Sequence, residues 1–301
     1  MSGESQRKWS GKTAGGNFGL GFLLSAVGNM PLACSYAMLE VGLPFHLLFS
    51  PKLFRATKHF FIRRMGCSNT EAFFKAYSTH RCFGRIMFDR FHLFTKGDGD
   101  FTITEEGRDI LLDTIEKSHG AVIAGTHVGS MEMAGYILGL DNVPINAIVY
   151  GGENATLQKR RSSHFLPHGI KMIPVSSDLS HLFAAKAALD NGESDSMPCD
   201  RIFGSSKCEI VDFLGAKAKF PIGAFMLAAQ LEREMILLFS MKEGKRGYRV
   251  LARHIEVDRS GKSSRQVAKE LLLLYVAELE KIVRDYPTQW FNFYEFWEED
   301  E

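Results

Sequence analysis

The stretch Ala121-Val-Ile-Ala-Gly-Thr-His-Val-Gly-Ser-Met-Glu-Met-Ala-Gly135 decides the fold. Ala121 to Ala124 is a short apolar run bounded by turn residues, which predicts a buried strand. Met131 to Leu140 is apolar with helical spacing, and Ser130 is suited to be the N-cap of that helix. The stretch therefore predicts a strand, a tight turn and a helix in direct succession.

His127 lies in this turn, and Glu132 follows five residues later. On one continuous helix, five residues would put the two side chains well over about 90° apart. They meet only if His127 is in the loop and Glu132 is in the first helical turn. We expect a general base with an orienting carboxylate, next to helix N-terminal N–H groups that stabilise an oxyanion. The alternative is a surface histidine and an acidic residue that merely favours the helix N-terminus.

The pattern His-x-Gly-x-x-Glu at a strand-to-helix turn resembles the His-x4-Asp/Glu block of the lysophospholipid acyltransferase superfamily. It is most similar to the bacterial lipid A biosynthesis (lauroyl/myristoyl) acyltransferase branch. The segment there usually reads His-x-Gly-Asn-Trp-Glu, so Ser130 and Met131 depart from it. The departure concerns the identity of the acceptor more than the pair of His127 and Glu132.

Further blocks extend the resemblance from Trp9 to Trp297. Asp200-Arg201 resembles the family's Gly-Asp-Arg segment, with Cys199 in place of the usual glycine. Pro287-Thr-Gln-Trp290 resembles its C-terminal Pro-x-Gln-Trp block, whose aromatic residues either seat the enzyme at a lipid interface or cap the core. Two weaker matches are the Trp- and Gly-rich leader and the Phe-Leu-Gly to Phe-Pro-x-Gly series, at 9–19 and 213–223.

The composition is that of a globular chain with a sizeable core. Of 301 residues, 45% are hydrophobic and 24% charged, and the net charge of +1 gives no global case for nucleic acid. The five cysteines are scattered without a C-x-x-C pair, so neither a metal site nor a disulfide framework is indicated, and a reducing, cytosol-facing location fits.

The N-terminal region from Phe18 to Phe49 is apolar, with Glu40 as its one formal charge. The break at Gly28-Asn-Met-Pro31 divides it into two pieces, which predicts a helical hairpin in the bilayer interface rather than a clean span. A basic flank from Lys52 to Arg64 supports contact with anionic lipid. A buried core hairpin and a cleaved signal peptide are the alternatives.

After the motif, strands and helices alternate through residue 191, and an antiparallel strand pair and a long C-terminal helix follow. The expected strands are 144–150, 171–175, 234–240 and 248–254, and the expected helices are 154–165, 180–191 and 263–285. We expect an α/β fold with a central mixed, largely parallel sheet flanked by helices, preceded by the apolar hairpin. Two domains are expected, at 1–50 for the hairpin and 51–301 for the acyltransferase unit.

Two helical segments carry features with two interpretations. Gln158-Lys-Arg-Arg161 is either a solvated face or a contact for phosphate, an acidic carrier protein or anionic lipid. Six aromatic residues between Asn69 and Phe94 form either core or the lining of an acyl-chain groove.

The resemblance implies an acyltransferase that moves a fatty acyl group from an acyl carrier protein or coenzyme A thioester to a lipid-linked hydroxyl or amine, without a metal or other cofactor. His127 would be the base and Glu132 its partner. The candidate substrate-binding residues are Gly129, Ser130, Arg160, Arg161, Asp200 and Arg201. The expected location is the cytoplasmic face of a bacterial inner membrane. A non-catalytic membrane protein that keeps the fold and a thioesterase are the rival functions.

Overall fold

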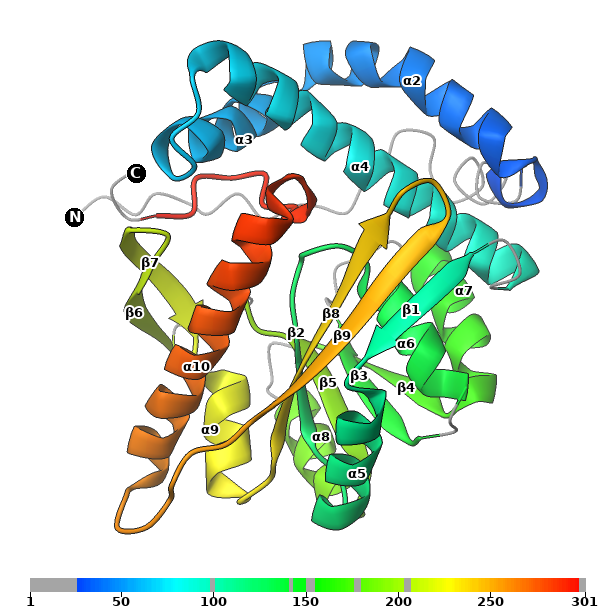
Figure 1. The fold of residues 1–301 in the computed structure, drawn as a ribbon. Coiled ribbons are helices and arrows are strands. Elements are labelled where there is room, and N and C mark those ends of the chain that lie inside the picture. Colours follow the sequence, from blue (N-terminus) through cyan, green and yellow to red (C-terminus); the bar gives the residue numbers. More distant parts are fainter. Residues whose placement is uncertain are drawn as a thin grey trace.

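The structure is a computed structural model, and it describes residues 26–97, 101–140, 143–149, 155–175, 180–202 and 207–297. The leader at 9–19 and the first part of the expected hairpin, up to residue 25, lie outside these residues. Within them, a seven-stranded sheet forms the centre of the molecule, and helices cover both of its faces (Figure 1).

The sheet has the strand order β1-β9-β8-β2-β5-β3-β4. Its strands are β1 (Thr102–Glu106), β2 (Val122–Gly125), β3 (Ile145–Val149), β4 (Ile170–Pro174), β5 (Ser194–Pro198), β8 (Met235–Glu243) and β9 (Gly247–Ile255). Every neighbouring pair is parallel except β8 and β9, which form an antiparallel hairpin. The expected mixed, largely parallel sheet is confirmed.

The two faces of the sheet have different covers. One face packs on α4 (Asn69–Lys96), α5 (Arg108–Ser118), α6 (Met131–Leu140) and α7 (Ala155–Phe165). The other packs on α8 (Ser180–Asp190), α9 (Gly223–Gln230) and α10 (Ser264–Asp285). β2 is buried along its whole length because it lies in the middle of the sheet. The strand that precedes the motif is therefore fixed by core on both sides.

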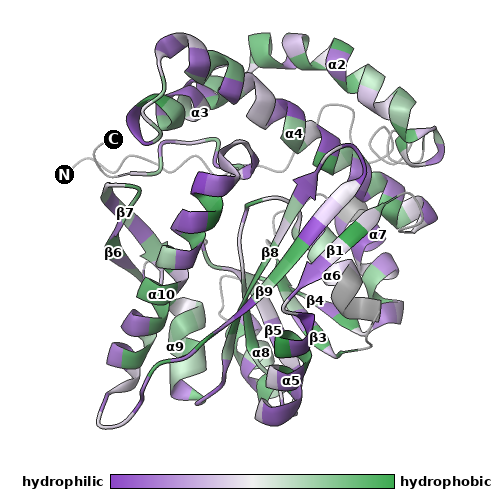
Figure 2. Cartoon of the chain, viewed as in Figure 1, coloured by the Kyte–Doolittle hydropathy of each residue, from purple (hydrophilic) through white to green (hydrophobic). Residues whose placement is uncertain are grey.

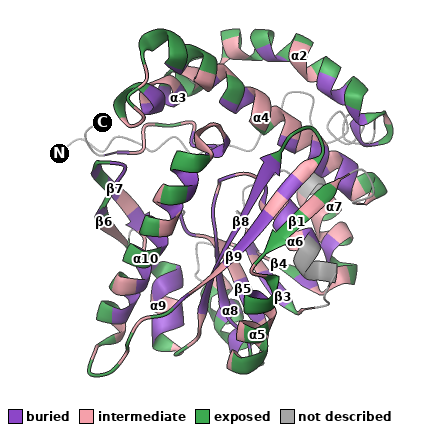
Figure 3. Ribbon diagram, in the orientation of Figure 1, coloured by how far each residue is buried: buried purple, intermediate pink, exposed green. Residues whose placement is uncertain are grey.

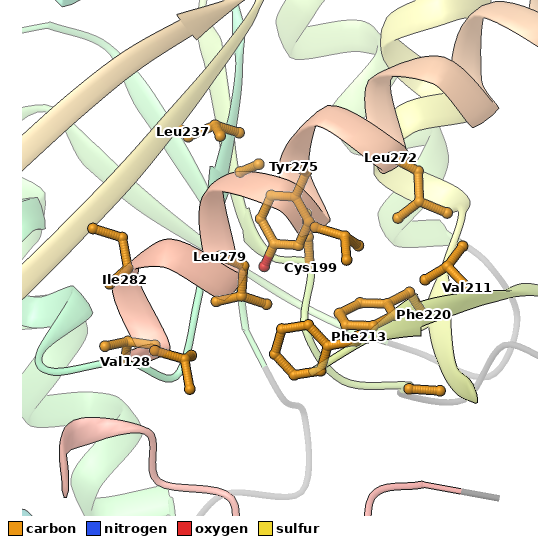
Figure 4. Packing of buried hydrophobic residues seen from close by; sticks show 14 of the residues in the cluster. Val128, Cys199, Val211, Phe213, Phe220, Leu237, Leu272, Tyr275, Leu279 and Ile282 are labelled. Carbon is orange, nitrogen blue, oxygen red and sulfur yellow. The ribbon is translucent and has the colours of Figure 1, made fainter. Parts of the chain in front are cut away.

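Three strands went unpredicted, one inside the central sheet and two in a separate pair. β5 reads Ser-Asp-Ser-Met-Pro, which is polar although the strand lies between β2 and β3. β6 (Cys208–Phe213) and β7 (Ala216–Pro221) form a separate antiparallel pair whose turn is Leu214-Gly215. In this pair the apolar residues alternate and face α10, as Figure 4 shows for Val211, Phe213 and Phe220.

An N-terminal layer of three helices arches over one end of the sheet (Figure 1). It consists of α2 (Leu32–Phe49), α3 (Pro51–Arg63) and α4, which packs against both of the others. α2 begins directly after Pro31, which fits the predicted break. α4 begins with a capping box between Ser68 and Glu71.

Candidate active site

The turn between β2 and α6 is held by backbone contacts from distant parts of the chain. Gly129 donates to the Gln289 carbonyl (2.9 Å), and Ser130 donates to the Ser240 carbonyl (2.7 Å). Gly129 has a φ of +69°, and a Cβ there would overlap the Ser240 carbonyl oxygen. Only glycine fits this position. Its predicted place in substrate binding remains untested, and its structural role is clear.

The start of α6 follows the sequence prediction. The Ser130 hydroxyl accepts from the amide of Met133 at 3.4 Å, as an N-cap side chain does. Val128, in the same turn, is buried and belongs to the core cluster with Leu279 and Ile282 of α10 (Figure 4). The turn is thus anchored on both sides of His127, whose side chain is 28% exposed.

The carboxylate in contact with His127 is that of Asp200, which follows the end of β5. Asp200 Oδ1 lies 2.7 Å from His127 Nδ1, and Asp200 Oδ2 accepts from the His127 amide at 2.9 Å. Because β5 pairs directly with β2, the ends of the two strands bring these residues together across 73 positions of sequence. One carboxylate therefore fixes both the backbone and the ring of His127.

Asp200 itself is fully buried and ionised. Burial opposes its ionisation, but the charge and hydrogen bond of His127, followed by the nearby Arg201 charge, lower the pKa of Asp200 to about 2. The indole Nε1 of Trp290 lies 3.4 Å from its Oδ2. A carboxylate held in this way accepts the Nδ1 proton of the ring, so Nε2 becomes the basic nitrogen.

Glu132 has different partners from those predicted. Its Oε1 lies 2.7 Å from Arg90 Nη1 of α4 and 3.7 Å from Arg161 Nη1 of α7. Burial opposes the ionisation of Glu132, yet the charges of Arg90 and Arg161 lower its pKa below the usual value. The structure therefore corrects the predicted contact between Glu132 and His127, because Asp200 is the carboxylate bonded to the ring. A catalytic role of Glu132 remains a prediction.

The remaining candidates fall into two groups. Arg161 is largely buried beside Glu132, and Arg160 is half-buried, with its carbonyl accepting from the Ser163 hydroxyl at 2.9 Å. Arg201 donates from Nη2 to the Phe291 carbonyl, so it holds the C-terminal segment near the motif. The Arg201 charge also helps to lower the pKa of the neighbouring Asp200.

The C-terminal block contributes to the site in a way that the sequence did not show. Gln289 accepts from Gly129, and Phe291 donates to the His127 carbonyl at 3.0 Å. Trp290 and Trp297 are 2% and 3% exposed, so they cap the core and do not face a lipid surface. The Pro-x-Gln-Trp block therefore holds the motif turn in place through these backbone hydrogen bonds.

One signal in the sequence points to Asp200. Functional groups in α/β sheets gather at the carboxyl ends of strands, and Asp200 comes two residues after β5. Recognising β5 would have made Asp200 a candidate partner of His127. Within the residues that the structure describes, no group of three or more His, Cys, Asp or Glu side chains is placed to hold a metal ion.

Residues 78–299 match the family described as bacterial lipid A biosynthesis acyltransferase. One solved structure to which this chain is matched is that of the 1-acyl-sn-glycerophosphate (LPA) acyltransferase PlsC from Thermotoga maritima. It has 16% sequence identity and a TM-score of 0.38, over 89% of this chain and 98% of that one. No curated protein matches.

Since the family match spans most of the chain, the protein belongs to the bacterial lipid A biosynthesis acyltransferase family. It is an acyltransferase of lipid biosynthesis.

Proposed function

We propose that the protein transfers a fatty acyl group from an acyl carrier protein or coenzyme A thioester to a hydroxyl or amine of a lipid acceptor, with His127 as the general base. The observation that carries this proposal is the bond between His127 Nδ1 and the buried, ionised Asp200 at 2.7 Å. An imidazole held by a carboxylate at one nitrogen is a base at the other.

The reaction follows from this arrangement. His127 Nε2 takes the proton of the acceptor O–H or N–H as the acceptor atom attacks the thioester carbonyl carbon. The tetrahedral intermediate then collapses, the C–S bond breaks, and the imidazolium gives its proton to the leaving thiolate. The products are an acylated lipid and a free thiol, and His127 returns to its neutral form. Asp200 stabilises the imidazolium in between.

The proposed site of action is the cytoplasmic face of a bacterial inner membrane, where thioester donors reside. Within the described residues, α2 is the one helix long and apolar enough to cross a membrane, and 22% of it is buried. Its exposed apolar residues form one stripe of Met38, Val41, Phe45, Leu48 and Phe49, and Figure 3 shows exposed bands along this helix. We infer that this stripe enters the bilayer interface.

The opposite side of α2 is bound to α4 through polar groups. Glu40 pairs with Arg81 and Arg85 at 2.6 and 2.7 Å, and the Tyr36 hydroxyl donates to Asp89 at 2.6 Å. A helix fixed along the protein by polar contacts presents its apolar stripe sideways to the membrane. This supports the interfacial arrangement over a span, and the cations of α3, such as Lys52, Arg55 and Lys58, suit anionic lipid.

The test is an assay of the purified full chain with a long-chain acyl-CoA, and separately with the acyl carrier protein thioester, in the presence of a bacterial lipid extract. We expect thiol release coupled to a new acylated lipid, and a loss of about 10²–10⁴-fold in His127→Ala. Glu234→Gln, which alters a His–Glu pair on the surface, is the matched control and should keep full activity.

Analysis of the products distinguishes the rival functions. A thioesterase would accumulate free fatty acid without an acylated lipid. Full transfer by a folded His127→Ala variant would show that the base is elsewhere, and no turnover with either donor would favour a binding protein.

A further inference from the structure

The backbone amides of the motif turn are engaged in holding the loop. His127 donates to Asp200, Val128 to the Thr126 hydroxyl, Gly129 to the Gln289 carbonyl and Ser130 to the Ser240 carbonyl, at distances of 2.7–3.0 Å. An oxyanion needs donors that point at it before the reaction begins. Because these four amides already donate within the protein, the expected backbone oxyanion site does not form from them.

Side chains supply positive charge at the same turn. Glu132, in the first turn of α6, holds the guanidinium groups of Arg90 and Arg161, at 2.7 and 3.7 Å. The three residues come from α6, α4 and α7, so the cluster exists only in the folded chain. Their side chains are 18%, 9% and 12% exposed, respectively, which places them in an environment of low dielectric constant with limited access from solvent.

The geometry suits two functions at once. A guanidinium group has five N–H donors in a planar fork, so it can bond to Glu132 with one edge and to an anionic oxygen of a substrate with another. The ion pair also fixes the long arginine side chains in advance, which reduces the ordering needed when an anion arrives.

We propose that Arg90 and Arg161 bind an anionic oxygen of the reacting complex, and that Glu132 is the positioning residue for these arginines rather than for His127. The proposal rests on the acyl-transfer function proposed above. It divides the work between two carboxylates: Asp200 orients the base, and Glu132 assembles the anion-binding group. Arg90, on a helix 37 residues upstream of the motif histidine, thereby joins the site.

The anionic oxygen has two possible sources. One is the thioester carbonyl oxygen, which becomes negative as the acceptor attacks. The other is a phosphate of the donor or of the lipid acceptor. Kinetics separate the two, since an interaction made only in the transition state changes kcat, whereas one made with the bound substrate changes KM.

The experiment measures thiol release from palmitoyl-CoA by the full chain, with a bacterial lipid extract, for Arg90→Lys and Arg161→Lys. If the ligand is the oxyanion, kcat falls by about 10²–10³-fold while KM for palmitoyl-CoA is unchanged. If the ligand is a phosphate of the thioester, this KM rises and inorganic pyrophosphate becomes a weaker competitive inhibitor. If it is a phosphate of the acceptor, the loss appears in the KM for the lipid extract and disappears with phosphatase-treated extract.

Lys159→Gln, an exposed cation on the same helix as Arg161, is the control and should behave as the wild type. Unchanged kinetics in folded Arg90→Lys and Arg161→Lys would overturn the proposal. Arg161→Lys alone decides this point if Arg90→Lys fails to fold, because Arg161 lies farther from Glu132.

The positioning role of Glu132 has its own readout, the kinetic parameter that its variant changes. Glu132→Gln should change the same parameter as Arg90→Lys and Arg161→Lys, whether kcat or KM, and combining it with Arg161→Lys should add little to the loss of either single variant. Combining it with Asp200→Asn should add the two losses in full. Full additivity with Arg161→Lys and no additivity with Asp200→Asn would show that Glu132 acts on His127. Transfer that persists in His127→Ala would instead overturn the proposed function and not this inference.

Discussion

At the motif turn, polar side chains meet one another inside the molecule while apolar residues form the surrounding core. In α2 the polar residues Tyr36 and Glu40 face the protein, whereas the apolar residues Val41, Leu48 and Phe49 face outward. Figure 2 shows hydrophobic bands along this outer helix, similar to those on the covered helices. Buried polar groups hold both regions in place, but only one of them exposes a reactive group.

Helix α4 links the two regions. Arg81, Arg85 and Asp89 bind α2, and the next residue, Arg90, binds Glu132 at the motif. The surface that we propose for the lipid interface and the site that we propose for acyl transfer are therefore joined by one helix. The comparison shows that polar contacts need not indicate a solvent-facing element, because in α2 they mark the side that faces the protein.

The largest effect is expected at the buried ion pair between Asp89 and Lys242. Their side chains are 1% and 4% exposed, and Asp89 also accepts from Tyr36 and Tyr248. Asp89→Leu leaves Lys242 buried without this partner, so we expect a loss of about 3–5 kcal/mol in the free energy of unfolding. Chemical denaturation measures it. The double variant Asp89→Leu/Lys242→Met should recover most of the loss, and a full additive loss would contradict this account.

The next effect is expected at the motif turn. Gly129→Ala adds strain at a positive φ and pushes β8 away through the Ser240 carbonyl. A displacement of about 1 Å can lower activity about 10²-fold, so we expect a loss of this size in transfer assays. Gly215→Ala, at a positive φ in the β6–β7 turn with open space around it, is the control and should retain activity. Equal activities of the two variants would show that the turn tolerates movement.

A smaller effect is expected at the outer stripe of α2. The triple variant Val41→Ser, Leu48→Ser and Phe49→Ser should weaken binding to anionic vesicles by about tenfold or more, since each exposed apolar side chain contributes to interfacial binding. The thermal midpoint should stay the same. Vesicle sedimentation measures the binding.

The matched control alters exposed apolar residues elsewhere, Leu166→Ser, Phe183→Ser and Ile210→Ser. A loss of binding in the control equal to that in the α2 variant would place the contact with lipid outside this stripe.

The smallest effect is expected at Asp195, which lies in β5, the strand that leads to Asp200. Asp195 is buried, and neither carboxylate oxygen has a hydrogen-bond partner within the described residues. Burial, with a smaller contribution from Glu193, raises its pKa from 3.8 to about 7. The folded state therefore keeps a proton that the unfolded state releases, and stability falls as pH rises from about 4 to about 7.

Asp195→Asn removes this dependence. We expect it to raise stability by about 1 kcal/mol at pH 8 and by less at pH 5, measured as the difference in thermal midpoint from wild type. A larger gain at pH 5 than at pH 8 would contradict the assignment.

The sequence predicted the elements whose residues follow a regular pattern. Strand β2, the start of α6 at Ser130, the β8–β9 hairpin and α10 were all anticipated, because burial and capping are visible in neighbouring residues. β5 was missed because its residues are polar. The family resemblance was confirmed by the match over residues 78–299.

The contacts between side chains within the site could not be predicted from the spacing of residues in the sequence. His127 and Asp200 are 73 positions apart, and Glu132 and Arg90 are 42 apart. Their contacts depend on the order of strands in the sheet and on where α4 crosses it. A short motif placed His127 and Glu132 together because they are close in sequence, while the folded chain gives each of them a partner from far away.

The most direct test of the central claim is the NMR assignment of the His127 tautomer, from its ring nitrogen chemical shifts, in the wild type, Asp200→Asn and Glu132→Gln. The His254–Glu234 pair serves as an internal reference. This account predicts the Nδ1-protonated tautomer in the wild type and in Glu132→Gln, and its loss in Asp200→Asn, whose side-chain amide can donate to Nδ1. An Nδ1-protonated ring that persists in Asp200→Asn but is lost in Glu132→Gln would contradict it.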